Sequence, residues 1–356
     1  MDDGINLERP DLSQVAPEVK AYIEALEARL ARDWRPERDT VTSPAPEPGE
    51  PPTTLNVITI SAKGMAKRTP RHLYGRQRRG GMGVFDLETG GDDAPAVLAV
   101  ADEDQVLLLF TDFGRAFRLP VADLAEAPVR AHGQRLASRL QFRPHERVVA
   151  ALPENGGAYV ALLSQRGWVR RVRSNYLGKS LIAGTTFHDV KEGGYLTAAC
   201  WTPGDAELFI ATRLGKAIRF LESQVPARGC LGIRVDVDDA AVAVTAVRSD
   251  SGVFLLGSDG KGTIRLMSGF SANKAPGAGG KVAMKTDHLI GAVTVADEDD
   301  IFVISELSKI IRFRADEVPV KEGVVQGVNC MALRNDEATA LTNSKRLGIG
   351  RCSIGD

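Results

Sequence analysis

Residues 105–119 read QVLLLFTDFGRAFRL: an apolar run, a short polar turn and a second run that contains an arginine. Variants of this phrase recur through the chain of 356 residues. A repeat of about 50 residues with β-type sequence is typical of radial or stacked folds, because one such unit cannot bury a core of its own. The six copies end at residues that we call the closing arginines, Arg68, Arg118, Arg171, Arg219, Arg265 and Arg312.

Each copy predicts a β-hairpin. The first strand is rich in β-branched and large apolar residues, as in LNVITI (55–60), and another apolar run follows further along each repeat, after the arginine. The unit therefore has about four strands, and six units over residues 55–356 predict an all-β, six-bladed, propeller-like disc. Four turns carry a glycine suited to positive φ, and the other two carry different residues at that place. In order these are Gly64, Gly114, Gly167, Gly215, Lys261 and Ser308.

The N-terminal segment, residues 1–54, differs in kind. Val19, Ile23, Leu26 and Leu30 follow an a/d spacing that predicts a short amphipathic helix within residues 1–34. This helix either docks on the disc or pairs two chains as a coiled coil, which would make a homo-oligomer. The next segment, residues 35–54, contains six prolines and predicts an extended linker with no core.

Composition narrows the class of protein. The net charge is −1, but the N-terminal segment (1–54) holds 12 acidic and 6 basic side chains, so the disc carries a net charge of +5. A mildly basic disc is compatible with a nucleic-acid partner. The four cysteines lie far apart without a CxxC pair, so we expect no metal, no disulfide and no cofactor, and a reducing cytoplasm. No apolar stretch is long enough to cross a bilayer, which predicts no membrane contact.

The most distinctive local sequence is YGRQRRGGMGV, residues 74–84. Three arginines within four residues precede three glycines within four. Guanidinium groups and backbone N–H groups both suit phosphate oxygens, so this loop is a candidate phosphate-binding segment.

Residues 55–84, LNVITISAKGMAKRTPRHLYGRQRRGGMGV, resemble the start of the C-terminal domain of the DNA gyrase A subunit. Within them QRRGGMG resembles the family's signature heptapeptide, the gyrase A box, Gln-Arg-Arg-Gly-Gly-Arg/Lys-Gly. The resemblance covers the whole disc, because the family's domain has six such repeats. It implies a β-pinwheel, a propeller-shaped fold with strands exchanged between neighbouring blades, whose basic rim bends DNA so that gyrase can introduce negative supercoils. The box residues carried over by position are Gln77, Arg78, Arg79, Gly80, Gly81 and Gly83.

Two departures qualify this resemblance. Met82 stands where the box has a basic residue, and the related topoisomerase IV subunit, whose box is degenerate, bends DNA less. The N-terminal segment is also too short for the family's breakage-reunion domain, so the chain resembles a free-standing wrapping domain. We therefore expect no catalytic residue, and an accessory part of a type II topoisomerase rather than an enzyme by itself.

The leading hypothesis is a DNA-bending module without sequence preference, cytoplasmic and nucleoid-associated, with duplex DNA and gyrase or topoisomerase IV subunits as partners. The alternative is a protein-interaction disc that binds topoisomerase or nucleoid partners. The closing arginines either face DNA on one rim or pair with a carboxylate of the next blade. The expected DNA-binding residues are Lys67, Arg68, Arg76, Gln77, Arg78, Arg79, Gly80, Gly81, Gly83, Arg115, Arg118, Arg170, Arg171, Arg173, Lys179, Lys216, Arg219, Arg265, Lys274 and Arg312.

Overall fold

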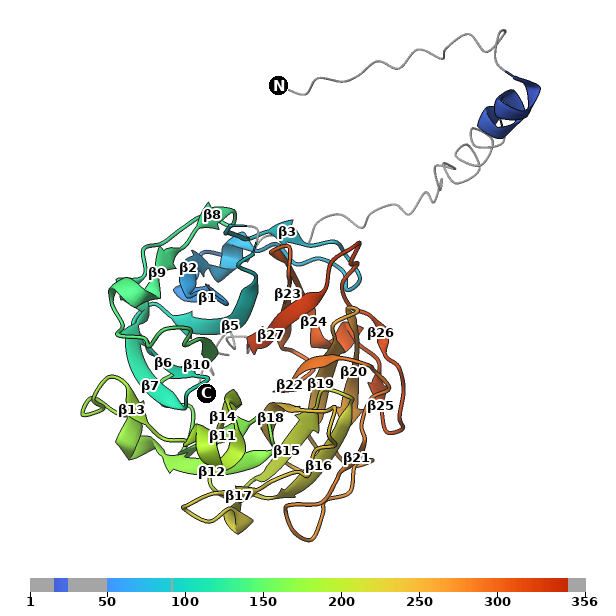
Figure 1. The fold of residues 1–356 in the computed structure, drawn as a ribbon. Coiled ribbons are helices and arrows are strands. Elements are labelled where there is room, and N and C mark those ends of the chain that lie inside the picture. Colours follow the sequence, from blue (N-terminus) through green and yellow to red (C-terminus); the bar gives the residue numbers. More distant parts are fainter. Residues whose placement is uncertain (1–15, 25–49, 91, 345–356) are drawn as a thin grey trace, which may run out of the picture. The chain divides into compact units, whose positions relative to one another are not determined.

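The computed structural model describes residues 16–24, 50–90 and 92–344 (Figure 1). The chain divides into two compact units, Met1–Ala45 and Pro46–Asp356. In the first unit residues 17–24 are helical and Val19 is exposed. Leu26 and Leu30 of the predicted apolar spacing lie outside the described residues, so chain pairing through this helix stays a prediction. In the described part of the chain, no helix is long and apolar enough to span a membrane.

The second unit is a closed ring of six blades, which confirms the predicted all-β fold (Figure 1). Each repeat forms the expected hairpin, because its two apolar runs flank a tight turn. The hairpins of blades 1 to 6 are β1 (Leu55–Ser61) with β2 (Met65–Pro70), β6 (Val106–Thr111) with β7 (Arg115–Pro120), β11 (Tyr159–Ser164) with β12 (Trp168–Arg173), β15 (Glu207–Thr212) with β16 (Lys216–Leu221), β19 (Gly252–Gly257) with β20 (Lys261–Leu266), and β23 (Asp300–Ser305) with β24 (Lys309–Arg314).

An inner strand completes the central side of each blade. It pairs antiparallel with the first hairpin strand and packs against the inner strands of both neighbouring blades, so the ring has no gap. The inner strands of blades 1 to 6 are β5 (Pro95–Asp102), β10 (Val148–Pro153), β14 (Leu196–Thr202), β18 (Ala241–Val247), β22 (Leu289–Val295) and β27 (Ala338–Ser344).

The outer strand of each blade comes from the next repeat, as the resemblance implied. In the last blade the exchange runs back to the first repeat, because β3 (Val84–Phe85) pairs with β24. Blade 5 has two outer strands, and β4 (Leu87–Glu88) pairs in parallel with β8 (Ala131–His132). The other outer strands, for blades 1 to 5, are β9 (Gln134–Arg135), β13 (Thr185–Thr186), β17 (Cys230–Leu231), β21 (Lys281–Val282), and β25 (Val320–Lys321) with β26 (Val328–Asn329).

Short helical turns lie in the segments between the hairpins and the next inner strands. A four-residue helix, α2 (Val190–Gly193), lies before β14. The 3-10 turns are η1 (Arg71–Leu73), η2 (Val121–Asp123), η3 (Leu136–Ser138), η4 (Ser174–Leu177), η5 (Glu222–Gln224) and η6 (Ala315–Glu317).

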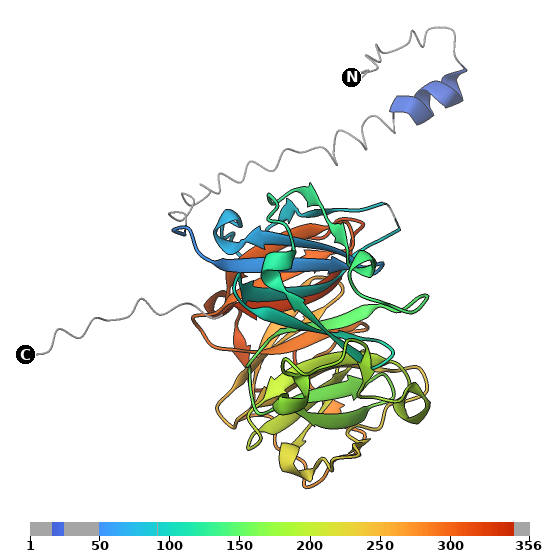
Figure 2. The same cartoon turned by 90° about the vertical axis from the view of Figure 1, so that its left-hand side faces the viewer.

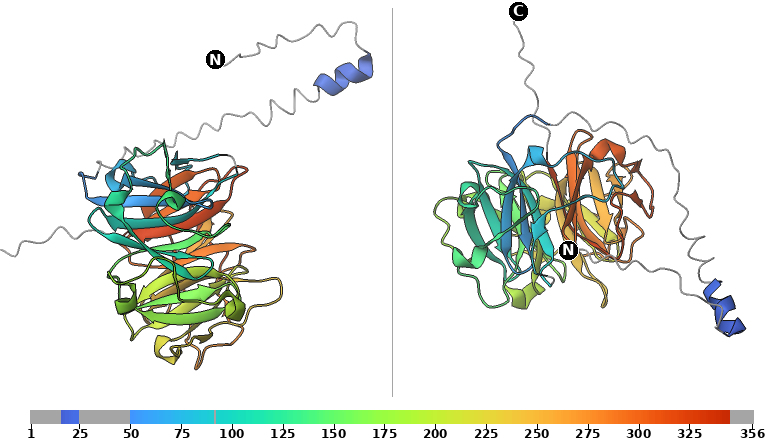
Figure 3. Two further views of the ribbon diagram at one scale, coloured as in Figure 1. Left: turned by 60° about the vertical axis from the view of Figure 1, so that its left-hand side comes forward. Right: turned by 90° about the horizontal axis from the view of Figure 1, so that it is seen from above.

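The core lies between blades rather than within them. Successive residues of one strand face opposite neighbours: Ile58 packs toward blade 2 and Val57 toward blade 6. We call the contact between blade 6 and blade 1 the closure seam, where the blue and red hairpins lie side by side (Figures 2 and 3). Of the six inter-blade cores that the described residues form, that of the closure seam is the smallest. It has seven buried apolar side chains, against sixteen between blades 1 and 2.

Candidate nucleic-acid interface

Closing arginines are engaged by carboxylates, in these two cases of their own blade. Arg118 donates to both carboxylate oxygens of Glu154, at 2.6 and 2.9 Å, and to the carbonyl of Leu177 at 2.9 Å. Arg219 is 5% exposed and its Nε donates to Glu207 at 2.6 Å. Bidentate pairing of this kind fixes a guanidinium group in one orientation.

A carboxylate also pairs with the closing arginine in three other blades. Arg68 pairs with Glu103 at 3.0 Å, Arg171 pairs with Glu222 at 3.2 Å, and Arg312 pairs with a carboxylate of β23. These arginines are buried or half-buried, so their charge is compensated by carboxylates instead of facing outward. This corrects the expectation of a ring of positive charge at these positions, and we no longer assign the residues to a DNA contact.

Arg265 is an exception that exposes an error in the repeat alignment. The turn residue with positive φ stands four positions before the arginine in the other copies, but Gly260 (φ 76°) stands five positions before Arg265. Ile264 therefore occupies the place of the arginine, and Arg265 faces the other side of β20, 5.7 Å from the ring centre of Phe270. Among the described residues no carboxylate pairs with it. The first hairpin strand begins with Glu207 in blade 4 and with Asp300 in blade 6, and these acids pair with the closing arginines there. In blade 5 the same position is Gly252, which has no side chain to form an ion pair.

Lys67, expected at DNA, is instead fully buried. Its Nζ pairs with Asp86 at 2.5 Å and donates to the carbonyl of Pro128 at 3.2 Å. Burial lowers the pKa of Lys67, while Asp86 opposes that shift. Both carboxylate oxygens of Asp86 are used, because Tyr74 donates to the same oxygen as Lys67 at 2.5 Å and Thr59 donates to the other at 2.6 Å. Lys67 is therefore a structural cation, because a buried ammonium needs this full set of partners.

The box loop is held mainly by contacts within the ring. The backbone N–H of Gln77 donates to the carbonyl of Arg312 at 2.8 Å, and its side-chain oxygen accepts from the N–H of Gly83 at 3.2 Å. The N–H of Gly80 donates to the carbonyl of Cys330 at 2.8 Å. These bonds attach the loop to the last two blades just before β3.

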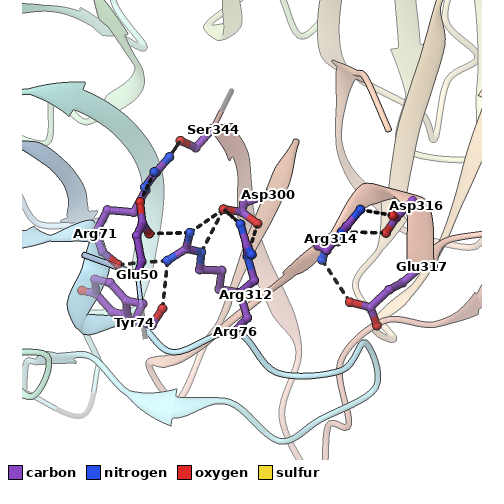
Figure 4. Close-up of polar contacts among 10 residues, drawn as sticks. All are labelled: Glu50, Arg71, Tyr74, Arg76, Asp300, Arg312, Arg314, Asp316, Glu317 and Ser344. Carbon is purple, nitrogen blue, oxygen red and sulfur yellow. Dashed lines mark hydrogen bonds and ion pairs between the residues drawn. The ribbon is translucent and has the colours of Figure 1, made fainter. Parts of the chain in front are cut away.

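Two of the three box-region arginines belong to the same attachment, which Figure 4 shows in part. Arg76 pairs with Asp300 at 2.8 Å. Arg79 donates to the carbonyls of Glu317 and Asn329 at 2.6 and 3.1 Å. This corrects the expectation that the loop offers three free cations to phosphate.

Arg78 is the remaining cation. Its side chain is exposed, and within the described ranges its guanidinium group has no hydrogen-bond or ion-pair partner. Met82 is also exposed, at 55%. The loop therefore presents one guanidinium group and one thioether outward.

The sequence analysis missed a second repeat, of glycines, whose period of about 50 residues is similar to that of the arginines. A Cβ on Gly83 would lie 2.6 Å from the carbonyl oxygen of Ile310, and one on Gly280 would lie 2.7 Å from that of Ala217. The last glycine of the box therefore belongs to a position that recurs in all six blades, and in five of them a Cβ would press against a backbone carbonyl of the hairpin. The positions are Gly83, Gly133, Gly184, Gly229, Gly280 and Gly327.

Three further predicted DNA-binding residues already have polar partners in the protein. Arg115 pairs with Glu146 at 2.5 Å, and Lys216 pairs with Asp236 at 2.5 Å. Arg170 donates to two backbone carbonyls, at 2.7 and 3.2 Å. By contrast, three predicted cations are exposed with no side-chain partner in the part of the chain that the structure describes. They are Arg173, Lys179 and Lys274.

Exposed cations without a carboxylate lie on the segments between each hairpin and the next inner strand, which we call the outer-strand segments. These segments carry the outer strands, so they form the periphery of the ring (Figure 1). Each of the six has at least one such cation: Arg78, Arg135, Lys179, Arg228, Lys274 and Lys321. Three of these six, Arg78, Lys179 and Lys274, were among the expected DNA-binding residues, and the other three were not.

The segment of residues 121–147 is the richest in arginine. Five exposed arginines follow one another at short intervals, and two of them pair with an acid, Glu88 or Asp123. They are Arg130, Arg135, Arg139, Arg143 and Arg147.

The described cysteines Cys200, Cys230 and Cys330 are free thiols. Cys330 is fully buried beneath the box loop, and burial raises its pKa to about 12. Because only the thiolate reacts, we expect Cys330 to resist iodoacetamide at pH 8 in the folded protein and to react after unfolding in guanidinium. Peptide mass spectrometry measures this, and rapid labelling in the native protein would contradict the burial.

Comparison with known proteins agrees with this geometry. A family model described as the DNA gyrase C-terminal domain, a beta-propeller, matches residues 55–94, 105–153, 206–244 and 299–339. The DNA gyrase A subunit of Chlamydia trachomatis is 31% identical over 314 residues, which are 84% of this chain and 37% of that protein. The corresponding protein of Mycobacterium bovis is 28% identical over 293 residues, 78% of this chain and 35% of that protein. The chain thus spans little more than a third of the length of these relatives.

Two solved structures share the fold. A DNA gyrase A C-terminal domain aligns with a TM-score of 0.72 and 20% identity, covering 81% of this chain and 99% of its own. The C-terminal domain of a DNA topoisomerase IV aligns with a TM-score of 0.59 and 20% identity, covering 82% and 93%.

Proposed function

Because the ring belongs to the DNA gyrase C-terminal domain family, we propose that it binds duplex DNA along its periphery and bends it there without reading the base sequence. The observation that carries this proposal is the exposed cation on each of the six outer-strand segments. Cations spaced around a closed edge favour phosphate contacts, which are independent of sequence.

The energetics allow bending as well as binding. Curving 20–30 bp by 40–90° costs about 1–6 kcal/mol. Contacts to phosphates on six successive blades offset that cost only if the DNA follows the edge of the ring. The exposed arginines of residues 130–147 give the first blades the highest density of cations, so we place the tightest contact there.

We assign no catalysis to the ring. DNA cleavage and ATP hydrolysis, the reactions that supercoiling requires, would come from topoisomerase subunits with which the ring acts. A cytoplasmic location and pairing through the N-terminal helix are parts of the same proposal.

Binding of a linear duplex over a salt series tests the proposal. Six phosphate contacts predict a log–log slope of about −5, so affinity should fall about 10³-fold between 50 and 200 mM salt. Duplexes of different sequence should give the same slope in fluorescence anisotropy. A slope near zero, or no binding at low salt, would support the protein-interaction disc instead.

A further inference from the structure

The closure seam is held by a polar cluster as well as by its small apolar core (Figure 4). Arg312 of blade 6 donates to Asp300 from Nε at 3.1 Å and pairs with Glu50 at 2.6 Å. The other carboxylate oxygen of Glu50 pairs with Arg71 of blade 1, and Arg71 donates to the hydroxyl of Ser344 at 2.6 Å. Glu50 thus lies between two arginines that come from opposite sides of the seam.

Glu50 lies in a cluster of arginines. Arg71 and Arg312 have side chains only 4% and 2% exposed, and Arg76 shares Asp300 with Arg312. Without the charge of Glu50, Arg312 would keep, among the described residues, only the carboxylate that it shares with Arg76, and breaking a buried ion pair is strongly destabilising. Burial alone would raise the pKa of Glu50, but hydrogen bonds from the two buried arginines hold that pKa below its usual value.

Arg312 connects Glu50 to the box loop. Its guanidinium group donates to the carbonyl of Tyr74 at 3.1 Å, and its own carbonyl accepts from the N–H of Gln77 at 2.8 Å. Both bonds hold residues 74–77, where the box loop begins, against Arg312. Further along the loop, the N–H of Gly80 donates to the carbonyl of Cys330.

Glu50 belongs to the segment predicted to be a linker without a core. The structure instead attaches residues 50–54 to the ring: Thr54 donates to Asp102 at 2.7 Å, and its carbonyl accepts from the N–H of Glu103 at 3.1 Å. We propose that the end of the N-terminal linker is a structural part of the ring. Glu50 acts there as a positioning residue: it joins the two sides of the closure seam and, through Arg312, keeps the box loop in place. Displacing this segment from the ring then releases the loop. The effect on the seam is independent of DNA, whereas its consequence for Arg78 rests on the proposed function.

The test uses the full chain with Glu50→Gln, which keeps the shape of the side chain and removes its charge. We expect amide exchange at Gln77 and Gly80, and alkylation of Cys330 at pH 8, to become about tenfold faster, because charged hydrogen bonds are lost. The matched control is Glu154→Gln. Its side chain is also 20% exposed and pairs with Arg118, but within blade 2, far along the ring from the closure seam. This control should leave all three rates unchanged.

Two results would overturn the inference: wild-type rates in Glu50→Gln, or an equal acceleration in Glu154→Gln. If Glu50→Gln does not fold, Glu50→Asp replaces it, and its shorter carboxylate should give rates between those of the wild type and a released loop. Wild-type rates in Glu50→Asp, together with an unfolded Glu50→Gln, would assign Glu50 to general stability rather than to the loop.

A DNA arm separates this inference from the proposed function. With Glu50→Gln we expect the salt slope to fall by about one unit, since the contact of Arg78 is lost. Energy transfer between dyes at the duplex ends should also report less bending. If the exchange and alkylation effects appear but the wild-type ring binds no DNA, the proposed function fails and the seam inference stands.

Discussion

Replacing one exposed cation on each of the six outer-strand segments is expected to weaken DNA binding strongly. Each phosphate contact contributes about 0.9 to the salt slope, so a sixfold alanine variant should bring the slope from about −5 toward zero and lower affinity at 50 mM salt by about 10³-fold. Folding should be unaffected, because these side chains are exposed and make no ion pair in the described part of the chain. The substituted residues are Arg78, Arg135, Lys179, Arg228, Lys274 and Lys321.

A control for this variant removes cations that already hold a carboxylate at the surface. Because those charges are compensated locally, their alanine variant should change the slope by much less than the sixfold variant does. Equal losses in the two proteins would mean that net charge, rather than the periphery of the ring, governs binding. The control residues are Lys63, Lys216, Arg248, Lys261 and Arg314.

Lys67→Met should be the most destabilising single substitution in the first blade. It leaves Asp86 charged and fully buried without its cation, although Thr59 and Tyr74 still donate to it. Removing one partner of a buried ion pair costs about 3–5 kcal/mol, which is a large part of the stability of a typical domain. Denaturant unfolding measures the loss, and adding Asp86→Asn should recover part of it.

Lys63→Met is the matched control for this substitution, in the turn of the same hairpin. Its partner is Asp92, and both side chains are more than half exposed. An exposed pair contributes about 0–1 kcal/mol, so this variant should unfold almost as the wild type does. If the free energy of unfolding falls equally in the two variants, the buried pair contributes no more to stability than the exposed one.

The hairpins could be predicted from the sequence because their signals are local. An apolar run, a turn residue such as Gly64 or Gly114 with positive φ and a second run define strand, turn and strand without tertiary information. The turn at Ser308 (φ 61°) shows why a non-glycine was accepted in one blade. Its hydroxyl accepts from the N–H of Leu87 at 2.9 Å and donates to the carbonyl of Leu87 at 2.7 Å.

The direction of the arginines could not be predicted in the same way. Alternation along a strand tells which residues share a face, but in this ring both faces of a hairpin are buried between blades. A repeated Arg68 or Arg219 therefore looks the same in sequence whether it meets DNA or a carboxylate. In the fifth copy Lys261 has a glycine on each side, so the sequence did not show that Gly260 is the turn residue. The repeat is therefore displaced by one residue there, and Arg265 lies on the opposite face of its strand.

The box illustrates a second limit of the sequence. Gly83 and Arg79 look like phosphate ligands when the segment is read alone. In the structure Gly83 packs so closely on the backbone carbonyl of Ile310 that a side chain would not fit, and Arg79 donates a hydrogen bond to the carbonyl of Glu317. Both roles depend on residues more than 200 positions away. No local pattern could have revealed such contacts, whereas the repeat of glycines before the outer strands could have.

Strand exchange at the closure seam also has a consequence for how the chain folds. Leu87, beside β3, bonds Ser308, 221 residues further along the chain. Closing a longer loop costs more entropy, and distant pairings form slowly. The last blade is therefore completed late, although its outer strand β3 belongs to the first repeat. During translation each earlier blade can be completed once the following repeat emerges, but β3 has no partner until the sixth hairpin exists. The residues of the box are therefore among the first to be made and the last to become ordered.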